Sequence, residues 1–250
     1  MKNRITIKTE AKELVRTGRA SPVLVSAITI AAAKVLDSLS TMILPGATIT
    51  VEDFQYMMTS GDISLLMEGA AFTSPMQPFF PIMLGLLTTV LYAGYDSYCM
   101  GIYHNREMPY SSLLDGLGII GQLIWCEILM AVKVFLWSML FVIPGIVAAY
   151  RYRFAVYNLL SDSSLTASQA IALSCRQTEG RKFDLFVLDL SFIGWSLLTS
   201  LTWGLLGIWT MPYMKLSELG YYFEAKARMD EAARRAFPGD ETPNDFGTYF

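Results

Sequence analysis

The chain has 250 residues, of which 53% are hydrophobic and only 16% are charged, and its mean hydropathy is +0.40. Soluble domains carry about a quarter charged residues, so this composition excludes an ordinary soluble protein and indicates an integral membrane protein. The formal net charge is −3, and we expect the lipid bilayer, and no nucleic acid, as a partner. The three cysteines lie in or beside apolar stretches and are expected to be free thiols.

The first two apolar stretches predict a pair of membrane-spanning helices at residues 22–44 and 79–103. Each is long enough, because a bilayer core about 30 Å thick needs about 20 apolar residues of helix. The segment between them, 47–78, holds four acidic residues and no Lys or Arg, whereas the first 19 residues hold six basic ones. Basic residues concentrate in cytoplasmic segments, so the N-terminus is predicted inside and the acidic segment outside.

The apolar region from residue 116 to residue 160 predicts a second pair of spans. Pro144 lies within it, and a proline inside a helix removes a backbone donor and clashes with the preceding turn. A single crossing would also leave the basic stretch around Arg181 outside the cell, against the charge rule. We therefore predict spans at 117–142 and 145–160, joined by a tight outer turn at 143–145.

A third pair of spans follows. One begins after Lys182 and ends near Thr202, a short outer turn occupies 203–207, and the last span covers 208–223 with a kink at Pro212. A charged helix at 224–235 then leads to an acidic tail at 237–250, which is rich in Pro and Gly and is predicted to be disordered. Before this hairpin, the Thr-Ala-Ser-Gln run at 166–169 matches a capping box and predicts the start of a short cytoplasmic helix.

Together these elements predict an all-α, polytopic membrane protein. About six transmembrane helices would form three antiparallel hairpins with short cytoplasmic amphipathic helices, within one membrane-embedded domain at 1–236. Both termini are predicted to be cytoplasmic, and the expected location is the plasma membrane.

Eight ionisable residues inside the predicted spans form the candidate site, an intramembrane charge network: Lys34, Asp37, Asp96, Glu127, Lys133, Arg151, Arg153 and Asp189. Each unpaired charge at mid-bilayer costs about 3 kcal/mol, so eight would cost about 24 kcal/mol, and pairing or hydration is required. Counted from the cytoplasmic ends, opposite charges match in depth: Asp37 with Lys133, Lys34 with Glu127, and Asp189 with Arg153. We select the last pair as the strongest. Two interpretations are open, either dry ion pairs that fix helix neighbours or a hydrated cavity for a ligand, an ion or a proton path.

No catalytic, metal or cofactor site is expected elsewhere. His104 is the only histidine, and without a cysteine cluster it favours an interfacial role over a zinc site. Ser191 and Ser196 have no histidine nearby in the predicted fold, so they are interpreted as helix-packing hydroxyls.

Three motifs carry a family resemblance: FLWSMLFVIPGIVAAYRY at 135–152, LDLSFIGW at 188–195 and GIWTMPY at 207–213. In this order they resemble a bacterial membrane family classified as domain of unknown function 975, over about residues 113–225. The resemblance implies a multi-span protein of the plasma membrane and no established activity, so no catalytic residue is carried over. Arg151, Asp189 and Trp195 fall inside the matching motifs.

The leading functional hypothesis is a non-enzymatic bundle that handles a small amphiphile, a peptide or an ion through its charged interior. Two alternatives remain, a structural or assembly partner of another membrane complex and an intramembrane enzyme that acts on lipid. Asp184 and Asp189 would be the acid pair of such an enzyme, but five residues separate them, so they do not share a helix face.

Overall fold

The computed structural model describes residues 4–17, 21–43, 79–104, 106, 113 and 117–236, and the regular structure within them is all helical. The fold is therefore all-α, as predicted. Its helices are α1 (Arg4–Thr17), α2 (Pro22–Ile43), α5 (Phe79–Tyr103), α6 (Ile120–Leu140), α7 (Val142–Tyr152), α8 (Ala155–Ser161), α9 (Ala167–Gln177), α10 (Lys182–Leu201) and α11 (Gly207–Ala236). The predicted acidic outer segment at 47–78 and the predicted tail at 237–250 lie outside the described residues.

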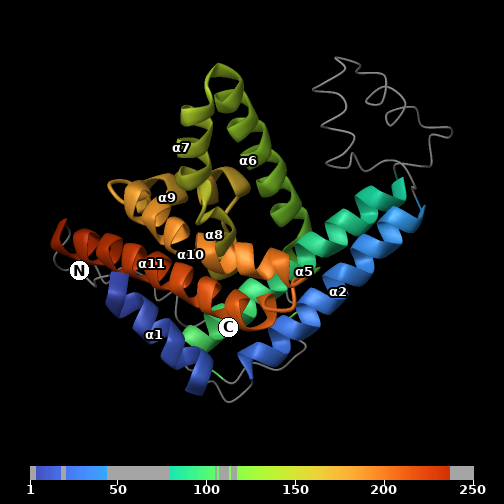
Figure 1. Cartoon of the computed structure of the whole chain (residues 1–250). Helices are drawn as coiled ribbons and strands as arrows, with labels where there is room; N and C mark the ends of the chain where they lie inside the picture. The colour runs from blue at the N-terminus through green and yellow to red at the C-terminus, as the bar shows by residue number, and fades with distance from the viewer. Residues whose placement is uncertain are drawn as a thin grey trace.

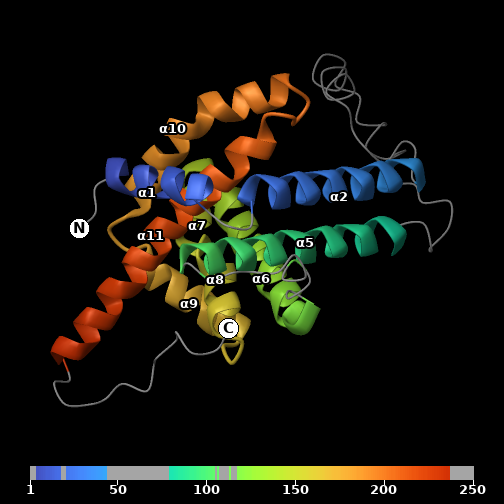
Figure 2. The same ribbon diagram turned by 90° about the horizontal axis from the view of Figure 1, so that it is seen from below.

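Three antiparallel hairpins diverge from a common base (Figure 1). The hairpins are α2 with α5, α6 with α7, and α10 with the first part of α11, and the base contains α1, α8, α9 and the rest of α11. The view from below shows that the α10–α11 hairpin and the α2–α5 hairpin extend from this base along different directions (Figure 2). The core lies where α5 crosses α11 and α8, around the fully buried side chains of Tyr95, Tyr98, Phe154, Leu216 and Tyr222.

The turn between α6 and α7 lies at Phe141, two residues before the predicted turn at 143–145. Phe141 is extended, with φ −160° and ψ 150°, and α7 begins at the next residue. Pro144 therefore occupies the first turn of α7, where the missing N–H costs no helical hydrogen bond. Gly145 follows because the two helices touch there: a Cβ on it would lie 2.1 Å from Ser138 Oγ and 2.9 Å from Ser138 Cα.

The predicted span at 145–160 is not one helix. α7 ends at Tyr152 and α8 begins at Ala155, and neither piece alone has the roughly 20 residues that cross a bilayer. The break is bridged from α9, where Ser174 Oγ donates to the Arg151 carbonyl at 2.8 Å and accepts from the Phe154 N–H at 3.0 Å. Thr178 Oγ1 also donates to the Arg151 carbonyl, at 3.3 Å. These hydroxyls replace helical hydrogen bonds that the break removes.

The third hairpin follows the sequence prediction closely. α10 ends at Leu201, the turn occupies the next five residues, and α11 continues through Pro212 into the charged helix. Trp203 and Gly204 adopt positive φ values of 57° and 88° in this turn. The capping box at the start of α9 is confirmed, because Thr166 and Gln169 exchange the expected hydrogen bonds.

Within the described ranges, three helical stretches are long and apolar enough to cross a membrane: Pro22–Ser40, Leu117–Leu140 and Lys182–Leu201. Less than a fifth of each is buried inside the protein. Large apolar side chains at the two described hairpin ends face outward, including Phe141, Ile143 and Leu201, and Trp203 is 94% exposed. Exposing so many large apolar side chains to water is unfavourable, so this surface indicates a membrane environment.

Candidate functional site

The salt bridge between Arg153 and Asp189 is the centre of the candidate site. Arg153 lies at the break between α7 and α8, and Asp189 lies in the first half of α10. The guanidinium holds the carboxylate with two contacts, Nη1 to Oδ2 at 2.5 Å and Nη2 to Oδ1 at 3.0 Å. Tyr150 adds a third donor, because its hydroxyl lies 2.8 Å from Asp189 Oδ2. The structure thus joins the pair that the sequence analysis selects.

Two residues of α11 complete the site, and the sequence analysis missed both. Glu218 Oε1 accepts from Arg153 Nε at 2.7 Å. Lys215 Nζ lies 2.8 Å from Asp96 Oδ1. We call these five residues the charge cluster: Asp96, Arg153, Asp189, Lys215 and Glu218. Lys215 and Glu218 stand three residues apart within the predicted span 208–223, and the rule that selected the other charges would also have found them.

A cavity of about 380 Å³ opens beside the charge cluster, between α10 and α11. We call it the α10–α11 cavity. Four members of the charge cluster line one end, all except Asp96. The remaining wall is mainly apolar with a few hydroxyls, from Ile30, Leu188, Phe192, Ser196, Thr199, Thr210, Met211 and Met214.

The spacing of these side chains shows why one face of each helix forms the cavity. On α10 the lining positions 189, 192, 196 and 199 are separated by three or four residues, which places them in one row along the helix. On α11 the positions 207, 211, 214 and 218 repeat the same spacing. The hairpin therefore presents two facing rows, charged at the base and mainly apolar toward the turn.

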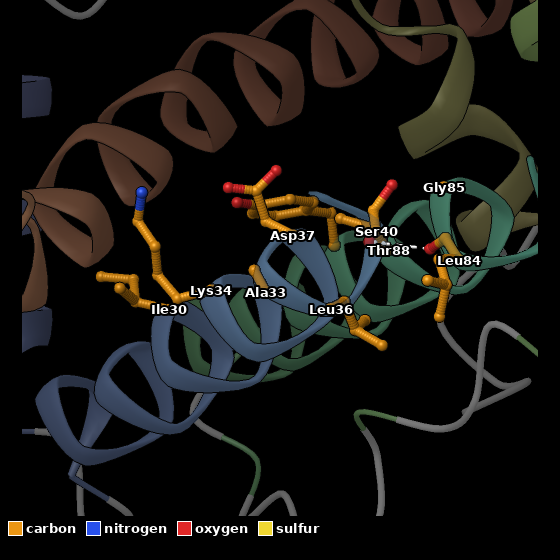
Figure 3. A pocket seen from close by; sticks show the side chains of 10 residues that line it. Ile30, Ala33, Lys34, Leu36, Asp37, Ser40, Leu84, Gly85 and Thr88 are labelled. Atoms are coloured by element: carbon orange, nitrogen blue, oxygen red, sulfur yellow. Dashed lines mark hydrogen bonds between the residues drawn. The ribbon is translucent and has the colours of Figure 1, made fainter. Parts of the chain in front are cut away.

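Lys34 and Asp37 lie in a second cavity, of about 420 Å³, between α2 and α5. Their side chains project from the same face of α2 together with Ser40, as Figure 3 shows. Among the described residues, neither Lys34 nor Asp37 makes an ion pair. Thr88 and Tyr92 of α5 supply further polar groups to this wall.

The other three predicted charges lie near the α6–α7 hairpin and join neither cavity. Glu127 accepts a hydrogen bond from Thr89 Oγ1 at 3.2 Å, and Lys133 Nζ lies 5.8 Å from the centre of the Tyr152 ring. Arg151 contributes its backbone carbonyl to the bridge from α9. The eight residues predicted as one network therefore occupy three separate places. Asp37 and Lys133, which match in depth, lie on hairpins that diverge (Figure 1).

Helix α1 contacts α10 through the side chain of Lys8. Its Nζ donates to Ser191 Oγ at 2.6 Å and lies 4.2 Å from the centre of the Phe192 ring. Partial burial, with a smaller contribution from the nearby positive charge of Arg4, lowers the pKa of Lys8 from its usual value. Lys8 thus places an ammonium group against an aromatic ring that also lines the α10–α11 cavity.

Ser191 and Ser196 are the two serine hydroxyls that the sequence analysis considers, and Ser191 Oγ accepts the hydrogen bond from Lys8 Nζ. Within the described ranges, no group of three or more His, Cys, Asp or Glu side chains is arranged to hold a metal ion. Ser191 Oγ donates to the carbonyl of Leu188, and Ser196 Oγ donates to that of Phe192, so both hydroxyls bond to their own helix. The arrangement offers fixed charges next to an apolar surface, which suits a ligand that has a charged part and an apolar part.

Residues 139–229 match the model of a family described as "Protein of unknown function (DUF975)". Searches of curated proteins and of solved structures found no matching protein. The matched segment runs from the end of α6 into α11 and contains Arg153, Asp189, Lys215 and Glu218, whereas Asp96 lies outside it. The resemblance noted from the sequence motifs is confirmed over residues 139–229.

Proposed function

We propose that this protein is a non-enzymatic, multi-span protein of the plasma membrane that binds a small amphiphile in the α10–α11 cavity. The observation that carries the proposal is the composition of that cavity. One end holds Arg153, Asp189, Lys215 and Glu218, and the wall beyond them is formed largely by Phe192, Met211 and Met214. A molecule with a polar headgroup and an apolar chain matches both parts at once.

The membrane environment supports an amphiphile over a free ion. An ion would use the charged end alone and leave the apolar wall empty, whereas a wholly apolar ligand would leave the charged end without a partner. Methionine side chains adapt to chains of different shape, which suits a flexible tail. The hydroxyls of Thr199 and Thr210 lie 3.3 Å apart across the hairpin and can accept a polar group part of the way along the tail.

The proposed topology has six crossings, with the common base in the cytoplasm and the three hairpin ends outside. Basic residues support this orientation, because α1 and the last turns of α11 are rich in Lys and Arg. The described ends of the α6–α7 and α10–α11 hairpins are made of Phe141, Val142, Trp203 and their apolar neighbours. Basic segments stay on the cytoplasmic side, and tryptophan is enriched at the membrane interface.

Cysteine labelling in intact cells tests this orientation. In a chain without the three native cysteines, Trp203→Cys should react with a membrane-impermeant thiol reagent added outside. Glu231→Cys, near the end of α11, should react only after the cells are opened. If both positions react from the same side, the proposed topology is wrong.

Ligand binding is tested with the full chain in nanodiscs and radiolabelled dodecylphosphocholine in a scintillation proximity assay. We expect saturable binding that Ser196→Trp abolishes, because the indole would fill the α10–α11 cavity. Ser200→Trp is the matched control, since Ser200 is exposed on the same helix and does not line the cavity. Equal binding by both variants, or no saturable binding by the parent chain, would overturn the proposal.

A further inference from the structure

We propose that the amphiphile of the α10–α11 cavity carries a cationic headgroup, an amine or a quaternary ammonium. This inference rests on the proposed function and adds the charge of the ligand. Two observations support the cationic headgroup: the net charge of the charge cluster, and the carboxylates of the cluster that line the cavity. The length of the lining rows on α10 and α11 indicates the length of the tail.

The charge cluster has one negative charge too many. It contains three carboxylates, of Asp96, Asp189 and Glu218, and two cations, Arg153 and Lys215, which leaves a net charge of −1. Asp96 also interacts electrostatically with Glu127, which is another carboxylate and supplies no compensating positive charge. A surplus charge is costly where the surroundings are apolar, and a bound cation would remove that cost.

The pairing pattern places the surplus at the cavity. Lys215 is matched with Asp96, whose side chain is only 9% exposed and does not line the cavity. Arg153 is then left to face both Asp189 and Glu218, which do line it. Lys215 also lines this end, but because it is paired with the buried Asp96, the cluster as a whole keeps one carboxylate in excess, so this end attracts cations.

Asp189 is the carboxylate that a ligand would meet. Its side chain is 36% exposed, whereas that of Glu218 is only 13% exposed. Phe192, the aromatic side chain of the cavity wall, also favours an ammonium, because such groups bind the faces of aromatic rings. Lys8 already places its ammonium 4.2 Å from the ring centre of Phe192, a residue of the same cavity wall.

The rows on α10 and α11 set the length of the tail. From Glu218 at the charged end to Gly207 near the turn, α11 advances eleven residues, which corresponds to about 16 Å of helix. Phe192 and Met214 line the space between these ends. The geometry therefore fits a single-chain amphiphile with an extended tail of about this length.

The experiment compares three ligands with the same tail: dodecylamine, dodecylphosphocholine and dodecanoate. Each is titrated in radiolabelled form against the full chain in nanodiscs of phosphatidylcholine. We expect dodecylamine to bind about tenfold more tightly than dodecanoate, which corresponds to one favourable charge contact. The ratio of the two affinities is measured on one preparation, so it does not depend on the fraction of folded protein.

Variants assign the preference to a residue. Asp189→Asn should lower the ratio of amine to carboxylate affinity about tenfold. Asp184→Asn is the matched control, since Asp184 is an exposed carboxylate in the first turn of α10 and does not line the cavity. Glu218→Gln provides a second carboxylate variant and should lower the ratio in the same direction.

The outcomes separate the two proposals. Equal affinity for all three headgroups, together with loss of binding in Ser196→Trp, would overturn the cationic headgroup and keep the amphiphile site. Tighter binding of dodecanoate would also overturn it and would point to Arg153 and Lys215 as the contacts. No saturable binding of any of the three ligands would overturn the proposed function as well.

Discussion

Removing Arg153 should destabilise the protein more than removing its partner Asp189, because the arginine holds two carboxylates and the aspartate holds one arginine. Breaking a buried ion pair by removing one partner costs about 3–5 kcal/mol, and both side chains here keep part of their solvent exposure. We therefore expect Arg153→Ala to lower the free energy of unfolding by about 3 kcal/mol, and Asp189→Ala by about 1.5 kcal/mol. The measurement is unfolding in mixed micelles, followed by far-UV circular dichroism.

The double variant measures the coupling free energy between Arg153 and Asp189. With Arg153 and Asp189 both replaced by alanine, Glu218 stays without its partner, so recovery should be partial and the total loss should remain near 3 kcal/mol, a coupling of about 1.5 kcal/mol. Adding Glu218→Gln should restore further stability. The exposed pair of Arg235 and Glu231 serves as control, with an expected coupling below about 0.5 kcal/mol. Additive losses at Arg153 and Asp189 would refute the reasoning.

Two further substitutions test the packing around α7. Gly145→Ala should cost about 1–3 kcal/mol because its Cβ would overlap Ser138, whereas Gly194→Ala, which meets nothing within 4 Å, should be neutral or stabilising in the same unfolding assay. Equal effects would contradict the close contact of α6 with α7. Ser174→Ala should cost about 2 kcal/mol because it leaves the Phe154 N–H at the α7–α8 break without a partner and removes one of the two hydroxyls that donate to the Arg151 carbonyl, and Ser168→Ala on the exposed face of α9 should have no measurable effect. A loss below about 0.5 kcal/mol for Ser174→Ala would show that the bridge from α9 is not needed.

The sequence predicts the helices best where composition alone decides their limits. α2 and α5 agree with the predicted spans to within one residue, since Pro22 can begin a helix and the apolar runs end at polar or turn residues. α10 ends one residue before its predicted limit, where the Trp-Gly turn begins. In each case the signal is local, so no knowledge of neighbouring helices is required.

The second hairpin shows where local signals fail. The sequence pattern around Pro144 predicts the centre of a turn, but a proline is equally suited to the first turn of a helix, and the sequence does not separate the two. The break after Tyr152 contains neither proline nor glycine. It exists because Ser174, some twenty residues further along the chain, supplies hydrogen bonds to the open backbone groups. Such a break depends on a tertiary contact, so the helix propensities of residues 151–155 do not predict it.

The charged residues show the same limit for the candidate site. Matching charges by depth assumes that all spans run side by side, and the hairpins meet only at their common base (Figure 1). Arg153 lies at the end of α7 that enters the base and Asp189 lies in the first half of α10, so the pair that depth selects does form. Asp37 and Lys133 lie further along two hairpins that separate, so equal depth does not bring them together. Depth therefore predicts partners only for charges near the base, and by that rule Lys215 and Glu218 on α11 belong with Asp96 and Arg153, where the structure places them.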